Sequence, residues 1–324
     1  MSSIKIIPFG GVRENGKNMY AVEIENQIFI LDAGLKYPEN ELMGIDVVIP
    51  DWEYLKKRKN DIVGVFLTHG HADAIGALPY FLMDFDVPVF GSEMTIALAK
   101  LAVKGHKEVK KFNDFHVVDE STAIDFNDVT VSFFATTHTI PETLGIVLET
   151  SEGNIVYTGD FKFDQTASTG YQTDLARLAE IGSQGVLALL SDSAGAGITG
   201  ASAREKDIGE YILETFKYQK GRIVVASVAS NIMRVQQIID AAVKVGRKLV
   251  LSGEDIVQII DTAMQLGKLK LPKDLLISME EANDLEPDQV VILETGKMGE
   301  PIKSLQQIAN GDNPKLHLSD SDLV

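Results

Sequence analysis

Short apolar runs dominate the first two hundred residues of the chain. They are rich in β-branched and aromatic side chains and end in turn residues, a pattern that is typical of strands. Two longer segments between them, residues 72–85 and 93–104, place apolar residues at helical spacing. The expected strands read IKIIPF, YAVEIE, QIFILDAG, IVGVFLTH, VPVFG, VTVSFFATTH, LGIVLET and NIVYTGD. The pattern predicts a mixed α/β layer structure.

The pattern changes near residue 205, where longer helical segments begin to alternate with short apolar strands. Helical spacing marks residues 204–221, 231–246 and 254–267, and the strand-like runs RIVVASVAS, KLVLSG and QVVILETG lie between and after them. This βαβ alternation predicts a parallel sheet and a second α/β unit. We therefore expect one domain over residues 1–205 and another over 206–324. The polar ending SDSDLV is expected to fray.

Composition places the chain among globular proteins. Of its 324 residues, 45% are hydrophobic and 24% are charged. It has no run of about 18 apolar residues, and its N-terminus lacks the long apolar stretch of a signal peptide. We expect a cytoplasmic protein without a membrane partner.

The formal charge of −17 argues against broad, non-specific binding of polyanions. It leaves room for a local basic groove. Two runs are basic, KKRKN at residues 56–60 and KGHKEVKKF at residues 104–112. By itself, such a run is more often a solvated face of a helix or loop.

The chain has no cysteine and six histidines, so a transition metal can be held only by His, Asp and Glu. His69 and His71 follow an apolar strand in LTHGHADAIG. Residues two apart in an extended segment point the same way, so both imidazoles can face one ion, and Gly70 lets the backbone bend around it. Asp73 follows, where it can bind metal, cap the next helix, or do both. Ala74 has no ligand atom.

Other strands also end in candidate ligands. His138 closes VTVSFFATTH, and Asp160 follows the strand in VYTGD. Alone, the first would as readily be a buried packing histidine and the second a turn residue. Together with His69 and His71 they predict a His₃Asp shell for one divalent ion. His106, His116 and His317 lie in unrelated contexts and are expected to be surface or packing residues.

The ordered phrases THGHADAIG, LDAG, TTHTIPETLG, TGDFKFDQT and LLSDSAGA resemble the successive motifs of the ribonuclease J family, in the β-CASP branch of the metallo-β-lactamase fold. The resemblance continues into KGRIVVASVASNIMRVQQII, ETGKMGEP and IANGD, so it covers nearly the whole chain. It implies an αββα sandwich with an inserted β-CASP α/β domain, here incomplete. The family's return segment and C-terminal domain are absent from this chain, which suggests a fragment of a longer protein.

The resemblance implies a metal-dependent phosphodiesterase that processes RNA by 5′–3′ exonucleolytic and endonucleolytic cleavage. His69, His71 and His138 would hold a first ion, Asp160 would bridge two ions, and Asp73 would hold the second. Zn²⁺ is the expected ion, with Mn²⁺ or Mg²⁺ as alternatives. Asp73 and Asp160 would be catalytic, and Asp32 would support the ligands by hydrogen bonding. The phrase with Ser230, Asn231, Met233 and Arg234 would bind RNA.

Several site motifs depart from the family pattern. Ala74 stands in place of a histidine ligand, Met233 replaces the histidine of SNIHR, and Arg13 stands where glycine is typical. SDSAGA and TGKMGEP differ from the family's SDSTNA and TGSQGEP. Because the changes cluster in site motifs while the core phrases persist, they indicate a retained fold with relaxed chemistry.

Three functions are therefore open. The chain can be a working ribonuclease, a degenerate paralogue that serves as a structural or RNA-positioning subunit, or a small-molecule hydrolase of the same fold. The SNIMRVQQII phrase argues against the third. We favour a ribonuclease J-type paralogue with a single metal ion and weak intrinsic activity. Its expected partners are RNA, an active paralogue in a hetero-oligomer, and a further copy of itself.

Overall fold

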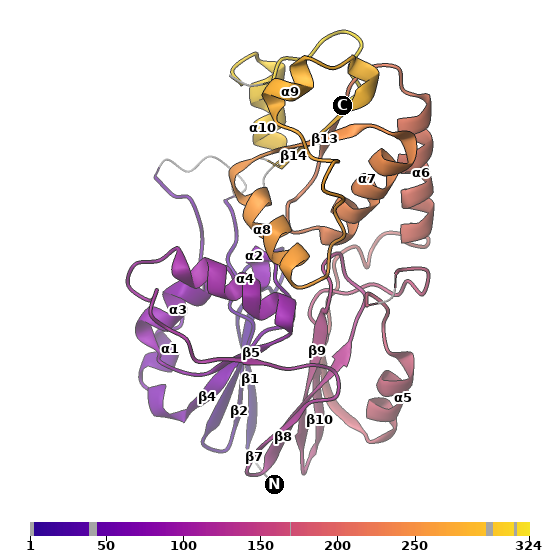
Figure 1. Cartoon of the computed structure of the whole chain (residues 1–324). Helices are drawn as coiled ribbons and strands as arrows, with labels where there is room; N and C mark the ends of the chain where they lie inside the picture. Colours follow the sequence, from indigo (N-terminus) through magenta and orange to yellow (C-terminus); the bar gives the residue numbers. More distant parts are fainter. Residues whose placement is uncertain (1–2, 39–43, 169, 296–300, 314–315) are drawn as a thin grey trace. The chain divides into compact units, whose positions relative to one another are not determined.

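The computed structural model describes residues 3–38, 44–168, 170–295, 301–313 and 316–324. Contacts within the chain divide it into two compact units (Figure 1). The first unit comprises Met1–His138 and Glu142–Ala201, and the second comprises Thr139–Pro141 and Ser202–Val324. Within the described ranges, every helix is too short or too polar to span a bilayer.

Two β-sheets form the centre of the first unit. One has the order β1-β2-β3-β4-β5-β6, with β1 to β3 antiparallel and β3 to β6 parallel. The other has the order β11-β10-β9-β8-β7, in which only the β10–β11 pair is parallel. The strands are β1 (Ile4–Gly10), β2 (Met19–Ile24), β3 (Gln27–Leu31), β4 (Ile62–Phe66), β5 (Val89–Gly91), β6 (Phe115–Val117), β7 (Ala123–Phe126), β8 (Val129–Ala135), β9 (Leu144–Thr150), β10 (Gly153–Tyr157) and β11 (Val186–Leu190).

The main core lies between these sheets. Alternate side chains of each strand point to one face, and the apolar faces of the two sheets pack together. Phe29 and Phe66 of one sheet share a buried cluster with Phe133 and Ile146 of the other. The ring of Phe66 also stacks on Phe90, with centroids 4.9 Å apart.

Helices cover the outer faces of the sheets. Helix α4 contacts β5 and β6 of the first sheet, and Ile181 of α5 packs on Phe134, Val147 and Val156 of the second. The layers are therefore helix, sheet, sheet, helix, which confirms the predicted αββα sandwich. The helices of this unit are α1 (Glu53–Lys56), η1 (Lys59–Asp61), α2 (Ala72–Ile75), α3 (Leu78–Asp84), α4 (Glu93–Lys104) and α5 (Leu175–Ser183).

The single helix expected over residues 72–85 is two helices, α2 and α3. Pro79 is the second residue of α3 and has no N–H with which to continue the α2 hydrogen-bond pattern. A proline is tolerated in a first helical turn, so the chain restarts there. Residues 115–117, 123–126, 175–183 and 186–190 also form elements that the apolar pattern did not single out.

A three-stranded parallel sheet organises the second unit, as the βαβ alternation predicts. Its order is β12-β14-β13, and its buried cluster includes Val224, Val250 and Ile292 from the three strands. The elements are α6 (Glu205–Tyr218), β12 (Ile223–Ala226), α7 (Ile232–Val245), β13 (Lys248–Ser252), α8 (Glu254–Gln265), α9 (Met279–Asn283), η2 (Pro287–Gln289), β14 (Val290–Glu294) and α10 (Pro301–Ala309).

The C-terminal residues are not frayed, contrary to the expectation from their polarity. Leu323 forms a parallel bridge to Ile223 and exchanges backbone hydrogen bonds with Arg222 and Val224 beside β12. The buried Asp322 carboxylate pairs with the Arg222 guanidinium at 2.5 Å. Tertiary pairing supplies partners for a segment that looks disordered by composition.

Candidate metal centre

Four strands lead to the candidate ligands and to the supporting residue Asp32. Adjacent parallel strands β3 and β4 run directly into Asp32 and into the Thr68–His71 segment. In the second sheet, β8 and β10 both lie antiparallel to β9, and they lead to His138 and Asp160. Because strands that point the same way end at the same edge of a sheet, residues from distant parts of the sequence meet.

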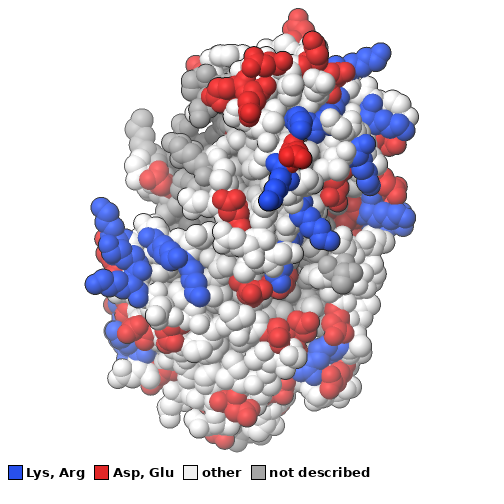
Figure 2. Space-filling model, viewed as in Figure 1, with Lys and Arg blue, Asp and Glu red and all other residues white. Residues whose placement is uncertain are grey.

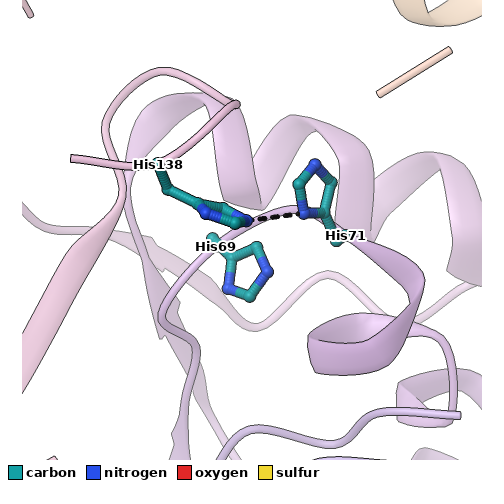
Figure 3. Close-up of side chains that lie close together, drawn as sticks. All are labelled: His69, His71 and His138. Carbon is teal, nitrogen blue, oxygen red and sulfur yellow. Dashed lines mark hydrogen bonds between the residues drawn. The ribbon is translucent and has the colours of Figure 1, made fainter. Parts of the chain in front are cut away.

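Three imidazoles converge at this edge. Figure 3 shows His69, His71 and His138 gathered around one point, the first two presented by one segment and the third by another. Their ring centroids lie 4.8 to 4.9 Å apart in every pair. His138 Nε2 and His71 Nδ1 are 3.0 Å apart and share a hydrogen bond. Two nitrogens bound to one zinc ion at about 2.0–2.1 Å lie at a similar separation, so the arrangement is close to that of a ligand set.

Two carboxylates complete the cluster. Ligand atoms of His69, Asp73 and Asp160 all lie within 4.8 Å of one another, and those of the three histidines meet the same limit. His69 Nε2 and Asp73 Oδ1 are 3.5 Å apart. Both atoms are buried without a hydrogen-bond partner among the described residues. Buried polar atoms are normally satisfied, so an unpartnered nitrogen and oxygen that face each other fit a divalent cation bound between them.

The pKa values of the clustered groups also favour a bound divalent cation. Burial disfavours the charged form of His69, but the neighbouring carboxylates outweigh it and raise its pKa to about 9. Burial, together with the charges of His69 and His71, lowers the pKa of His138 to about 2. Burial and the Asp73 charge raise the pKa of Asp160 to about 6, although His69 opposes them. A divalent cation would neutralise the carboxylates without relying on these protons.

A chain of hydrogen bonds from Asp32 through Thr68 to Nδ1 orients the His69 ring. The buried Asp32 carboxylate accepts from the Thr68 N–H at 2.8 Å, from the Thr68 hydroxyl at 2.9 Å and from the Tyr157 hydroxyl at 2.9 Å. The Thr68 hydroxyl thus gives its proton to Asp32, so its oxygen accepts from Nδ1–H of His69 at 2.9 Å. This tautomer leaves Nε2 of His69 to face the cluster.

Sequence reasoning predicted a supporting role for Asp32 but did not single out Thr68 or Tyr157. Both residues could have been identified because they lie close in sequence to predicted ligands. Thr68 precedes His69 in the THGH motif, and Tyr157 lies in the VYTGD phrase with Asp160.

Two glycines allow the ligand segments to pack closely. A Cβ atom on Gly34 would lie 1.5 Å from the backbone oxygen of Asp73. Gly159 has φ +58°, and its Cβ would lie 2.7 Å from the Cβ of Thr68. Any side chain at these positions would displace the segments that carry the ligands.

The second half of the expected two-metal site differs from the first. Ala74 is fully buried in α2, and its side chain offers no ligand. Asp73 does not cap the helix, because α2 begins at Ala72 with His71 at the N-cap. Asp73 lies in the first turn, and its carboxylate turns toward His69.

The predicted RNA-binding phrase opens helix α7 in the second unit. Asn231 is the N-cap, and its side chain accepts from the Arg234 N–H at 3.0 Å. Met233 is 5% exposed, and the Arg234 guanidinium reaches Gln237 at 2.8 Å and the buried Glu205 at 3.5 Å. The RNA-binding role of Ser230, Asn231, Met233 and Arg234 stays a prediction. The TGKMGEP phrase lies almost entirely in residues 296–300, outside the described ranges.

The remaining histidines serve packing or lie at the surface, as predicted. The His106 ring meets Tyr80 edge-on at 4.9 Å, and the His116 ring stacks on Phe90 at 4.9 Å. The His317 side chain is exposed.

Comparisons with known proteins agree with this architecture. Residues 12–188 match the metallo-β-lactamase superfamily, and residues 220–324 match the β-CASP domain of ribonuclease J. A crystal structure of a protein of unknown function from Enterococcus faecalis V583 has a TM-score of 0.68 at 14% identity, and the match covers 100% of this chain and 89% of that one. This last likeness shows the fold alone.

Curated relatives are much more similar in sequence. Ribonuclease J 2 of Streptococcus pyogenes serotype M3 is 55% identical over 100% of this chain and 59% of its own length. Ribonuclease J 2 of Staphylococcus epidermidis strain RP62A is 43% identical over 99% of this chain and 58% of its own length. The chain thus spans less than two thirds of the relatives it matches. It belongs to the metallo-β-lactamase superfamily and carries the β-CASP domain of ribonuclease J.

Proposed function

We propose that the chain is the metal-binding part of a ribonuclease of the ribonuclease J type, with weak intrinsic activity. The observation that carries the proposal is a pair of possible ligand sets that share His69, one with His71 and His138 and the other with Asp73 and Asp160. His69 Nε2 and Asp73 Oδ1 are also buried without a hydrogen-bond partner among the described residues. The family matches and the ribonuclease relatives supply the substrate class, RNA.

His69, His71, His138 and Asp160 would hold a single ion, with zinc favoured because nitrogen ligands predominate. Asp73, the carboxylate of the impaired second site, lies beside this set. When bound, such an ion polarises the phosphoryl oxygens and makes a water molecule nucleophilic at neutral pH. Asp73 and Asp160 would orient that water and accept its proton. Asp32 and Thr68 would keep the His69 ring in the tautomer that binds metal. Mn²⁺ or Mg²⁺ in the same place is the alternative.

Ala74 is the reason to propose weak activity. It removes a side-chain ligand from the place where the family pattern has histidine, and two-metal stabilisation of both reacting oxygens then fails. A role beside an active paralogue in a hetero-oligomer follows from this loss, with RNA positioning as the contribution of this subunit. Self-association and a cytoplasmic location are part of the same proposal, as is the division into a metallo-β-lactamase domain over residues 1–205 and a partial β-CASP domain over 206–324.

Zinc titration calorimetry and cleavage of a 5′-monophosphorylated RNA test the proposal together. We expect one zinc per chain, slow cleavage, and loss of zinc binding in His71→Ala. His116→Ala is the matched control, because His116 lies outside the cluster and should leave the zinc stoichiometry unchanged. Ala74→His should raise the stoichiometry and increase cleavage modestly, although the added ring must enter a fully buried position. Zinc binding that survives His71→Ala, or two zinc ions on the parent chain, would contradict the assignment.

A further inference from the structure

The second basic run lies on one exposed segment of the first unit. We call residues 100–111 the basic segment. It covers the end of helix α4 and the turns that follow, and it contains a single acidic residue, Glu108. The whole chain has 47 acidic residues against 30 basic ones, so this local excess runs against the overall charge. Its five lysines, all exposed, are Lys100, Lys104, Lys107, Lys110 and Lys111.

The two basic runs of the sequence differ in whether their charged side chains form ion pairs. In the first run, Lys56 pairs with Asp84 at 3.2 Å, and Arg58 pairs with Glu23 at 3.0 Å. Over the described ranges of the chain, by contrast, no lysine of the basic segment forms an ion pair. Two members of the first run, Lys56 and Arg58, are therefore ion-paired, whereas the lysines of the basic segment present uncompensated positive charge. Figure 2 shows Lys and Arg side chains at the left of the view, on the side of the first unit where α1, α3 and α4 lie.

Buried apolar side chains attach the basic segment to the core of the first unit. Val103 is 1% exposed and Val109 is 8% exposed, so two apolar side chains fix the turns to the core. The half-buried rings of Phe112 and Phe115 meet edge to face at 5.1 Å, and the Lys100 ammonium lies 5.5 Å from the Phe115 ring centre. Exposed lysines beside partly exposed aromatic rings are the features with which proteins hold single-stranded nucleic acid.

Helix α4 relates the basic segment to the metal centre. The Met94 N–H in its first turn donates to the Glu142 carboxylate at 3.0 Å, and Glu142 follows His138 closely in sequence. The helix then runs for 12 residues, which is a length of about 18 Å. The lysines therefore lie at the end of the helix that points away from the His138 loop.

We infer that the basic segment is an RNA-binding surface outside the metal centre. It binds phosphates of single-stranded RNA several nucleotides away from the phosphodiester bond that is cleaved at the metal centre. It therefore favours long RNA substrates over short ones. The inference rests on the proposed function, because it takes RNA as the ligand. An acidic protein would meet the same charges but would make no use of the flanking aromatic rings.

The experiment compares two triple variants with the same change in charge. In Lys104→Gln/Lys107→Gln/Lys111→Gln the basic segment is neutralised. In the control, Lys56→Gln/Lys57→Gln/Lys59→Gln, the first basic run loses the same number of lysines, of which Lys56 is ion-paired. Binding is measured in EDTA, which prevents cleavage, with a 5′-monophosphorylated oligouridylate of about 15 nucleotides and with the corresponding trinucleotide. All six positions are exposed, so urea unfolding should show unchanged stability.

We expect the segment variant to bind the long RNA at least tenfold more weakly at physiological salt. Loss of three phosphate contacts should reduce the slope of log K against log salt by about 2, since each contact on a single strand contributes about 0.7. The control variant should stay within twofold of the parent. Bound RNA should also protect Lys104, Lys107 and Lys111 from acetylation, as read by mass spectrometry.

Other outcomes overturn the inference in distinguishable ways. If the parent binds neither RNA, both the inference and the proposed function are wrong. If the parent binds long RNA and the two triple variants lose affinity equally, the basic segment is only a solvated face, and the proposed function stands. If the segment variant keeps RNA affinity but loses binding to polyglutamate, the surface serves an acidic protein.

Discussion

At the scale of single residues, the metal centre depends on groups that bind no metal. Thr68 is fully buried and connects two partners: its hydroxyl donates to Asp32 and accepts from His69 Nδ1. Orientation of a ligating imidazole by hydrogen bonds to its second nitrogen contributes about 10 to 100-fold to metal affinity or activity. The hydroxyl of a single threonine therefore sets the direction of a ligand.

We expect Thr68→Val to weaken zinc binding by about 10 to 100-fold, because valine keeps the shape but breaks the chain between His69 and Asp32. Thr68→Ser keeps the hydroxyl and should stay near the parent value. Competition with a chromophoric chelator measures both constants. Equal zinc affinity in the two variants would rule out the orienting role.

The same residue scale explains an unusual sequence position. Arg13, which stands where the family has glycine, adopts φ +59°, in the left-handed region that favours glycine.

At the scale of elements, a cluster of polar contacts ties the edge of the first sheet to α1. Glu23 on β2 is 5% exposed and accepts from Tyr54 at 2.8 Å, from Lys5 at 3.0 Å and from Arg58 at 3.0 Å. Burial by itself would raise the pKa of Glu23, but the three hydrogen bonds outweigh it and lower the pKa to about 2, from an ordinary value of 4.5.

We expect the stability that Glu23 contributes to depend on pH. Since its folded-state pKa is lowered, the contribution is fully present above the ordinary value of 4.5 and is lost as pH falls from there toward 2. Urea unfolding should therefore show that the parent has a larger free energy of unfolding than Glu23→Gln. This difference should be constant from pH 7 to pH 6 and should become smaller below pH 5. Exposed Glu120→Gln is the control and should show no pH-dependent difference from the parent. A parent-to-variant gap that widens on acidification would contradict the assigned contacts.

At the scale of the whole molecule, all five candidate ligands belong to the first unit and none to the second. A ligand that binds only the folded state stabilises it by about 2.7 kcal/mol when its free concentration is 100 times Kd. Zinc should therefore protect one unit selectively.

Hydrogen exchange with zinc and with EDTA tests this prediction. We expect zinc to slow exchange in residues 67–73 and 136–160, and to leave the strands β12, β13 and β14 unchanged. His71→Ala should abolish the difference between the two conditions. Equal protection of both units would mean that zinc acts through a global effect rather than through this cluster.

The sequence by itself determined a mixed α/β layer structure, the parallel sheet of the second unit and the candidate ligands. Local periodicity and polar residues at strand ends encode these features, whereas the αββα arrangement was predicted from the resemblance to a known family. The tertiary structure alone decided which atoms meet. Thr68 and Tyr157 became part of the centre through contacts with Asp32, a residue more than a hundred positions from Tyr157. The polar C-terminal segment is ordered beside β12. Asp73, for which the sequence left both metal binding and helix capping open, does not cap α2 and faces His69. Long-range pairing produced each of these outcomes, because the free energy of satisfying a buried polar group depends on partners that local sequence does not specify.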